Sequence, residues 1–496
     1  MAIFPEYQQL VDQKRAKQAS LIPPEWRLPK AITDKVSPSS NASAFDLMLE
    51  HQILTKEELD ITENYTAAAL VKSMAAGNLT SLEVTTAFCK RSAVAQQLTN
   101  CLTEIFFEKA FERARQLDEY LAKEGVPKGP LHGLPISIKD TYMVEGEYAT
   151  ISYVSKLKLP TATSNSAIVD ILLEAGAVLY VKTTVPQTLF VCESFNSIFG
   201  TTLNPHRLSL SAGGSTSGEG VLVAFRGSVL GVGSDIGGSA RVPALANGTY
   251  GFKPSSNRLP YGGQQEILRK GWPGIMPAAG PLASSAEDLT LFTRTVIEAR
   301  PWLHDATAYH IPWRSVPKKD RLVVGFFPGD ELFPVFPPIA RALSTAVDKL
   351  KAAGHTVKRL TCPPLIAILT TAARSFALDQ SGRFGGWLAE AGEEPIKAVS
   401  DLIAQMHSGA DDISLESVWQ FTAEREDILE ESAKIWRENE LDVLLTPGAR
   451  GTAVPHGNFG MPIYSIPWNL LDVVGWRFED EEVLNATEVI SEVLNN

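Results

Sequence analysis

Within the segment from Gly213 to Arg241, Ser215 and Ser239 each lie in a glycine-rich turn. Upstream, Pro135–Lys139 reads as a short apolar strand that carries a single lysine, Lys139. Glycine adopts backbone conformations that other residues resist, so clustered glycines let main-chain N–H groups converge on a ligand. Two hydroxyls, a lysine on a strand and a row of glycine amides together indicate acyl transfer.

The motifs extend beyond these serines. The stretch from Gly233 to Pro243 reads GSDIGGSARVP, and the stretch from Leu131 to Asp140 reads LHGLPISIKD. Together they resemble the signature of the amidase signature family, and the N-terminal segments are most similar to fungal acetamidase-type enzymes. The resemblance runs from about Ile61 to Leu494. It implies an α/β fold, with a mixed central β-sheet flanked by helices on both faces.

The resemblance also implies a role for each site residue. Ser239 is the expected nucleophile, Ser215 the bridging serine and Lys139 the base of a Ser-Ser-Lys triad. The peptide bond between Gly214 and Ser215 is expected to be cis. The expected oxyanion hole consists of the main-chain amides of Ile236, Gly237, Gly238 and Ser239. Asp235 and Arg241, which flank the nucleophile, are interpreted as a structural pair that holds the turn.

Lys139 can act as a base only when it is neutral, and an ordinary lysine has a pKa of about 10.4. The apolar neighbours Pro135, Ile136 and Ile138 predict a buried site, and burial lowers the pKa of an amine. Because neighbours on a strand point to opposite faces, Asp140 should point away from Lys139, while Ser137 should share its face.

The same residues taken singly have simpler interpretations. A lysine at a strand end is usually solvated, and serines beside glycine usually form turns. The linked order of three residue types favours catalysis: hydrolysis of small carboxamides to carboxylic acid and ammonia through a serine acyl-enzyme. Two alternatives stay open, namely an inactive amidase-like protein and an amidotransferase subunit.

Two departures from the family pattern bear on whether the protein is an active enzyme. Thr216 and Ser217 stand where the family has Ser and Gly, and a positive φ at Ser217 would be strained. In addition, Trp468–Asp472 runs almost directly into Gly475–Asp480. A longer stretch with a core strand is expected between these two segments. The sequence therefore predicts that a segment is missing near residues 473–475, through a natural deletion, a splice variant or a gene-model error.

The composition of the chain narrows the classes of partner that it is expected to bind. The net charge of −12 and the pI near 5.3 argue against nucleic-acid binding. No basic leader or long apolar run indicates a membrane. Four separated cysteines are typical of reduced thiols, so a cytoplasmic enzyme is expected. The histidines lack metal-ligand spacing, and the chemistry calls for neither a metal nor a cofactor. A homodimer remains open.

The expected organisation is an N-terminal helical arm over residues 1–60, broken by prolines, and an amidase signature domain over residues 61–496. Three further strands are predicted, at Val178–Val181, Leu322–Phe327 and Val443–Leu445. The expected helices are Glu63–Lys90, Lys109–Leu121, Ser166–Ala175 and a helix that contains Ile339, Leu343, Val347 and Leu350 on one face.

Overall fold

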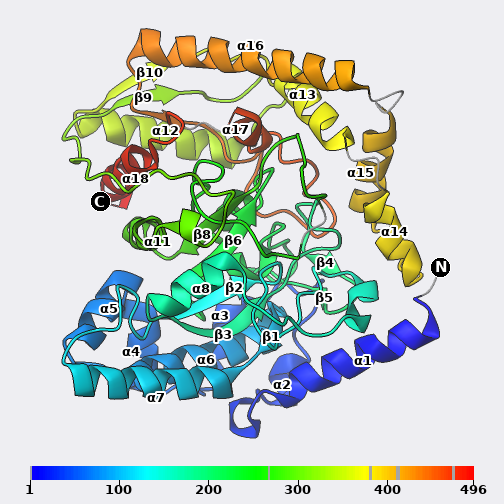
Figure 1. Ribbon diagram of the computed structural model, residues 1–496, viewed down its shortest axis with the longest axis vertical. Coiled ribbons are helices and arrows are strands. Elements are labelled where there is room, and N and C mark those ends of the chain that lie inside the picture. The colour runs from blue at the N-terminus through cyan, green and yellow to red at the C-terminus, as the bar shows by residue number, and fades with distance from the viewer. Residues whose placement is uncertain (1–2, 266–267, 379–381, 409–413, 472–474, 496) are drawn as a thin grey trace.

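The computed structural model describes residues 3–265, 268–378, 382–408, 414–471 and 475–495. Two sheets and their covering helices dominate the molecule (Figure 1). No helix within these ranges is both long and apolar enough to cross a membrane.

The main sheet contains six strands in the order β1-β3-β2-β6-β8-β7. Their bounds are β1 Leu102–Ile105, β2 Pro135–Lys139, β3 Val178–Thr183, β6 Leu230–Asp235, β7 Tyr250–Gly251 and β8 Ala278–Ala283. Strand β2 runs parallel to both β3 and β6, whereas β1, β7 and β8 pair antiparallel with their neighbours. The predicted mixed sheet is therefore confirmed.

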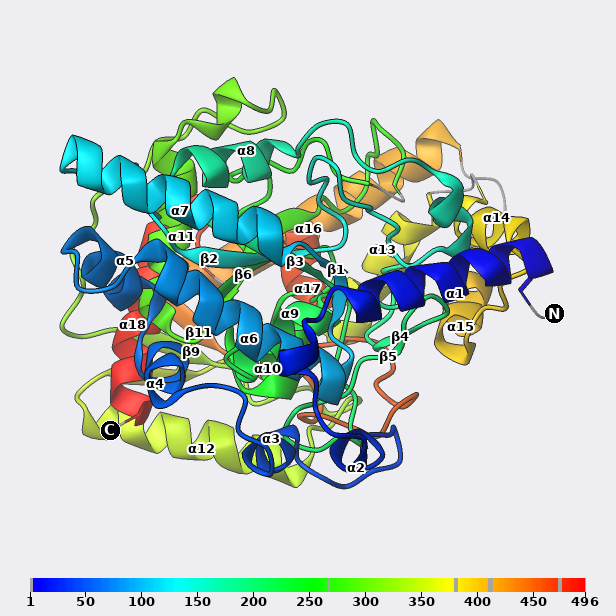
Figure 2. The same ribbon diagram turned by 90° about the horizontal axis from the view of Figure 1, so that it is seen from below.

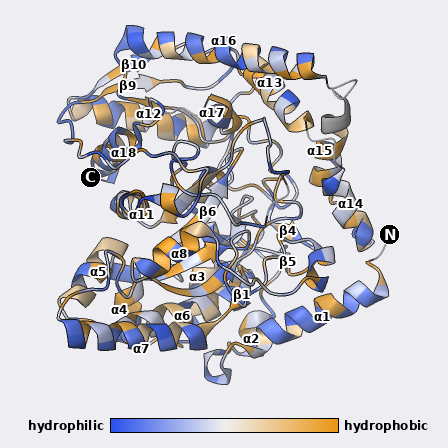
Figure 3. Ribbon diagram, in the orientation of Figure 1, coloured by the Kyte–Doolittle hydropathy of each residue, from blue (hydrophilic) through white to orange (hydrophobic). Residues whose placement is uncertain are grey.

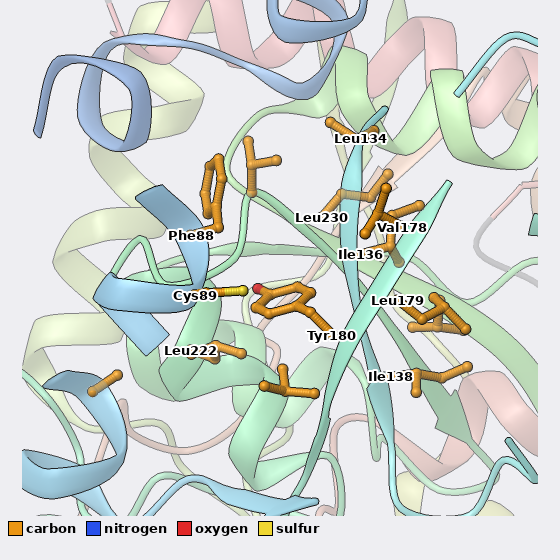
Figure 4. Close-up of a cluster of buried hydrophobic side chains, with 14 of the residues drawn as sticks. Phe88, Cys89, Leu134, Ile136, Ile138, Val178, Leu179, Tyr180, Leu222 and Leu230 are labelled. Atoms are coloured by element: carbon orange, nitrogen blue, oxygen red, sulfur yellow. The ribbon is translucent and has the colours of Figure 1, made fainter. Parts of the chain in front are cut away.

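Helices cover this sheet on both faces (Figure 2). One face carries α7 (Phe107–Glu124), α8 (Ala167–Glu174) and α11 (Ala286–Glu298). The opposite face carries α6 (Ser81–Thr99), α9 (Ser217–Ala224) and α10 (Arg241–Asn247). Alternating side chains of the strands fill both layers. Tyr180 points toward Phe88 and Cys89 of α6, while Leu179 and Ile138 point the other way (Figure 4).

The N-terminal part wraps around this core. Its elements are α1 Pro5–Ser20, η1 Pro24–Trp26, α2 Lys30–Thr33, α3 Ala44–Leu49, α4 Lys56–Asn64 and α5 Ala67–Ala75. Short elements join the sheet to its loops: η2 Val154–Lys158, β4 Phe195–Asn196, β5 Gly200–Thr201 and η3 Pro301–Leu303. Trp26, Leu47 and Ile61 pack into the same buried cluster as the main sheet. The predicted boundary at residue 60 stays a prediction.

The C-terminal part builds a smaller, parallel sheet in the order β10-β9-β11. Its strands are β9 Val323–Phe326, β10 Thr356–Arg359 and β11 Val443–Leu445. The surrounding helices are α12 Pro337–Ala352, α13 Leu365–Ala377, α14 Arg383–Glu390, α15 Lys397–Ser408, α16 Leu415–Asn439, α17 Ile466–Leu471 and α18 Asp480–Asn495. Hydrophilic and hydrophobic residues intermix along α16, whose inner side buries Phe421 and Trp436 (Figure 3).

Several sequence expectations are confirmed and others are wrong. Strands β2 and β11 have the predicted bounds. The single helix predicted over Glu63–Lys90 is wrong, because Gly77 (φ 72°) follows the end of α5 and a Thr80 capping box starts α6. The strain expected at Ser217 is also absent, because Ser217 is the first residue of helix α9. The predicted missing segment falls largely on residues 472–474, which lie outside the described ranges.

Candidate active site

Lys139 stands at the end of β2 and is 1% exposed. Its Nζ donates to three side-chain hydroxyls: Ser215 Oγ at 3.0 Å, Thr216 Oγ1 at 2.9 Å and Ser234 Oγ at 2.9 Å. These partners come from the turn before α9 and from the end of β6, the strand that lies beside β2. The fold thus surrounds the lysine with neutral hydroxyls.

Burial lowers the pKa of Lys139 to about 7, against the opposing attraction of Asp235 and Glu219. Desolvation disfavours the ammonium form, whereas nearby carboxylates favour it. A substantial neutral fraction therefore exists near neutral pH. In this state the amine has the lone pair that a base requires.

Glu219 lies on α9, is fully buried and was not predicted as a site residue. It accepts hydrogen bonds from Ser137 Oγ at 2.5 Å and Thr183 Oγ1 at 2.9 Å. Burial raises the pKa of Glu219 to about 8, against these hydrogen bonds and the nearby Lys139. Room for its carboxyl depends on Gly231, where an added Cβ would come within 1.9 Å of Glu219 Oε2. The one available signal in the sequence was an acidic residue with a glycine on either side. Glycines allow neighbouring segments of the chain to approach closely.

Asp235 and Arg241 hold the turn between β6 and α10. Arg241 Nε donates to Asp235 Oδ2 at 3.0 Å, and Nη2 donates to Oδ1 at 2.9 Å. Although burial acts in the opposite direction, this guanidinium holds the pKa of Asp235 well below its ordinary value. Asp235 also accepts from the main-chain amides of Gly238 (2.8 Å) and Ala240 (3.1 Å). The geometry of this pair matches the structural role expected for it.

The two serine turns lie against each other. The Gly214–Ser215 peptide bond is cis, as expected. Thr216 N donates to Ser239 O at 3.0 Å, which joins one turn to the other. Gly238 takes a φ of 115°, which favours glycine, and its N–H is engaged by Asp235. Of the four predicted oxyanion donors, we therefore propose that Ile236, Gly237 and Ser239 serve this role.

Two cavities meet at Ser239. The larger, of about 420 Å³, is lined mainly by apolar residues that include Leu189, Phe190, Met461 and Ile466. The smaller, of about 50 Å³, is lined by Ser215, Ser234, Tyr261 and Gln265 among others. Both cavities are bordered by Ser239, Ile236, Leu189 and Phe190. Of the two cavities, Ser215 borders only the smaller one.

The wall of the larger cavity is assembled from distant segments. Phe190 makes edge-to-face contacts with Phe384 of α14 and Phe376 of α13, at centroid distances of 4.6 and 5.8 Å. The buried Glu193 accepts from the main-chain amides of Gly457 (3.0 Å) and Phe459 (2.8 Å). A carboxylate thus fixes the loop that supplies Gly457, Asn458 and Met461 to the lining.

The orientation predicted for Asp140 is confirmed. Asp140 accepts from Thr103 Oγ1 at 3.0 Å, Thr150 Oγ1 at 3.1 Å and Ile151 N at 2.7 Å, away from the Lys139 amine. Ser234, by contrast, was missed as a partner of Lys139. A serine inside a strand motif gives no sign of the residue that it faces across the sheet.

Comparisons with known proteins show the family of this chain. A profile of the amidase family matches residues 83–478. The amidase of Gibberella moniliformis is 50% identical in an alignment of 526 positions that covers 98% of this chain and 99% of the relative. The acetamidase of Emericella nidulans is 39% identical, with coverage of 97% and 89%. The structure of a fatty acid amide hydrolase superposes with a TM-score of 0.92 at 31% identity, covering 99% of this chain and 96% of that chain. The chain therefore belongs to the amidase signature family, a family of amide hydrolases.

Proposed function

We propose that this protein hydrolyses primary carboxamides with apolar acyl groups to carboxylic acid and ammonia, through an acyl-enzyme on Ser239. The observation that carries this proposal is the buried Lys139 amine, whose pKa is lowered to about 7 and which lies 3.0 Å from Ser215 Oγ. The family membership and the relatives named amidase and acetamidase support the same reaction class.

In the first half-reaction, neutral Lys139 takes the proton of Ser215, and Ser215 takes the proton of Ser239. The Ser239 oxygen then forms a bond to the amide carbon, and the carbonyl electrons move onto oxygen. In this mechanism the main-chain amides of Ile236, Gly237 and Ser239 donate to that oxyanion. Donors of this kind typically contribute about 3 kcal/mol each to transition-state stabilisation.

The C–N bond then breaks as Ser215 returns a proton to the leaving nitrogen, with Lys139 supplying it. Ammonia departs and leaves an ester between the acyl group and Ser239. Water, deprotonated through the same relay, attacks that ester and releases the carboxylic acid. The sum of both halves is amide plus water giving acid plus ammonia, so no further reactant is needed.

We infer from the two cavities where each end of the substrate binds. The leaving nitrogen must reach Ser215, which borders the small cavity, so this side accepts ammonia or a small amine. The acyl group then occupies the larger apolar cavity, whose volume of about 420 Å³ exceeds the needs of an acetyl group. We therefore expect aryl or medium-length aliphatic acyl groups to be favoured over acetyl.

The test is ammonia release from acetamide, butyramide, benzamide and phenylacetamide by the parent chain and by Ser239→Ala. The parent should turn over phenylacetamide with a higher kcat/KM than acetamide, and Ser239→Ala should lose about 10³-fold or more. Ser209→Ala is the matched control and should retain activity, because Ser209 donates its hydroxyl to Asn41 and lines neither cavity at Ser239. Unchanged activity in Ser239→Ala would refute the assignment.

A further inference from the structure

The segment from Tyr261 to Gln265, which reads YGGQQ, borders the smaller cavity at Ser239 but has no part in the mechanism described above. Its first and last residues, Tyr261 and Gln265, both line that cavity. Within the described part of the chain, neither of them lines the larger cavity, which we assign to the acyl group. The segment Tyr261–Gln265 is called the cap below.

One anchor of the cap is the carboxylate of Asp305. Its Oδ2 accepts from the main-chain amides of Tyr261 at 2.9 Å and Gly262 at 2.6 Å, and its Oδ1 accepts from Thr307 Oγ1 at 2.8 Å. Although burial acts in the opposite direction, these hydrogen bonds hold the pKa of Asp305 below its ordinary value. A charged acceptor makes such hydrogen bonds stronger than neutral ones, so this end of the cap is held firmly.

Two further anchors hold the rest of the cap. Gln265 N donates to the main-chain oxygen of Thr141 at 2.9 Å, two residues after the base Lys139. Ser166 Oγ donates to Gly263 O at 2.8 Å, and Gly263 has a φ of 77°, which favours glycine. Three separate segments of the chain therefore fix the cap, and one of them continues directly from the strand that carries the base.

The volume of the capped cavity limits the group that can leave through it. Of the two cavities at Ser239, Ser215 borders only this one, so the leaving nitrogen faces the cap. The cavity has a volume of about 50 Å³. A water-sized molecule needs about 10–15 Å³ of such space, so ammonia fits, whereas an amine with a propyl or phenyl group exceeds the room available.

We propose that the cap is the specificity determinant for the leaving group, and that it restricts turnover to primary amides by excluding amides that carry a propyl or larger group on nitrogen. This inference rests on the proposed function, because the mechanism places the leaving nitrogen at Ser215. Tyr261 and Gln265 act by direct contact with the group on nitrogen. Asp305 is a positioning residue, which acts by holding the cap in place.

The experiment compares phenylacetamide with N-propyl phenylacetamide and measures kcat/KM for both from the release of phenylacetic acid. The parent should prefer the primary amide by about 10²-fold or more. Tyr261→Ala and Gln265→Ala each enlarge the smaller cavity, so each should raise kcat/KM for the secondary amide, relative to the primary amide, about tenfold or more. Both rates come from the same sample, so their ratio does not depend on the folded fraction of a variant.

Asp305→Ala tests the anchor, because Asp305 lines neither cavity at Ser239 in the described part of the chain. It should raise the same ratio about threefold or more, mainly through a lower KM for the secondary amide. The matched control is Asp118→Ala. The carboxylate of Asp118 likewise accepts from two consecutive main-chain amides, those of Ser81 (2.6 Å) and Leu82 (3.0 Å), away from both cavities. This control should leave the ratio unchanged even where it lowers the thermal midpoint.

The outcomes separate this inference from the proposed function. Turnover of phenylacetamide with an unchanged ratio in both Tyr261→Ala and Gln265→Ala would overturn the inference alone, as would a parent that hydrolyses the two amides equally well. A ratio that changes as much in Asp118→Ala as in Asp305→Ala would overturn the role given to Asp305. A parent that releases acid from neither amide would refute the proposed function, and the inference with it.

Discussion

Lys139 is the residue whose protonation state controls the proposed reaction. With its pKa lowered to about 7, it holds the proton below that pH and can accept one above it. We therefore expect kcat/KM for phenylacetamide to be lost as the pH falls through about 7 and to level off above it. A profile measured from pH 5 to 10 checks this. An acid limb near the ordinary lysine value of 10.5 would contradict it.

Asp235 is the residue on which the shape of the nucleophile turn depends. Asp235→Asn removes the charge that pairs with Arg241 in a buried setting, and it should lower the free energy of unfolding by about 3 kcal/mol. It should also reduce kcat, because the main-chain amides of Gly238 and Ala240 lose part of their anchor. Urea unfolding and ammonia release measure the two effects.

The control for Asp235→Asn is Asp34→Asn, which breaks an exposed pair with Lys30 whose side chains are 58% and 84% exposed. Such a pair contributes at most about 1 kcal/mol. If the two variants lost equal stability, the buried pair would not have the importance assigned to it.

At this scale three linked motifs predicted Lys139, Ser215 and Ser239 as a triad, and the structure brings Lys139 Nζ within 3.0 Å of Ser215 Oγ. The catalytic roles of the three residues stay a prediction. The sequence did not predict that Ser234 and Glu219 contribute to the surroundings of Lys139. The pairing of β2 with β6 brings Ser234 to Lys139, although the two residues are 95 positions apart in the sequence. The packing of α9 brings Glu219 to Ser137, across 82 positions. Such contacts leave no local pattern in the sequence.

Among the elements, α15 contributes Leu402 to the lining of the larger cavity, which we propose receives the acyl group. Leu402→Trp should fill part of this cavity and lower kcat/KM for phenylacetamide about tenfold or more, while acetamide changes less than about threefold. Leu402→Ala, which enlarges the cavity, should leave both substrates within that range. Equal losses for both amides in Leu402→Trp would argue that the acyl group binds elsewhere.

The bounds of β2 and β11 were predicted, since both are apolar runs bounded by clear breaks, whereas β1, β6, β8 and β10 were not among the predicted strands. The helix boundary between α5 and α6 was missed although the capping box at Thr80 and Glu83 was legible in the sequence. Helix α1 runs for 16 residues where short, broken helices were expected. Its Pro5 occupies the first helical turn, where proline is tolerated and does not break a helix.

Over the whole molecule, Arg258 ties the C-terminal helix α18 to the segment that follows β7. Its fully buried guanidinium donates to Asp480 Oδ2 at 3.1 Å and Glu481 Oε1 at 2.6 Å. Arg258→Met leaves two buried carboxylates without this partner and should lower the free energy of unfolding by about 3–5 kcal/mol. Urea unfolding followed by circular dichroism gives the value.

Arg314 provides the comparison, because it also contacts Glu481 but is 41% exposed. Arg314→Met should lower the free energy of unfolding by no more than about 1 kcal/mol. A larger loss from Arg314→Met than from Arg258→Met would show that the surface contact, and not the buried one, secures α18.

The resemblance predicted the mixed main sheet and its helical layers, and the comparisons agree with both. The separate three-stranded sheet was not predicted in this form. Its arrangement depends on the parallel pairing of β9 with β10 and with β11, and β11 lies far from β9 in the sequence.

The central claim is that Ser239 is the nucleophile and Lys139 its base. Reaction with a phosphonylating probe that carries an apolar chain, followed by peptide mass mapping, tests this claim whatever the natural substrate is. The account predicts one adduct, on Ser239, absent in Ser239→Ala and formed about 10²-fold or more slowly in Lys139→Ala. An adduct on another residue, or an unchanged labelling rate in Lys139→Ala, would contradict it.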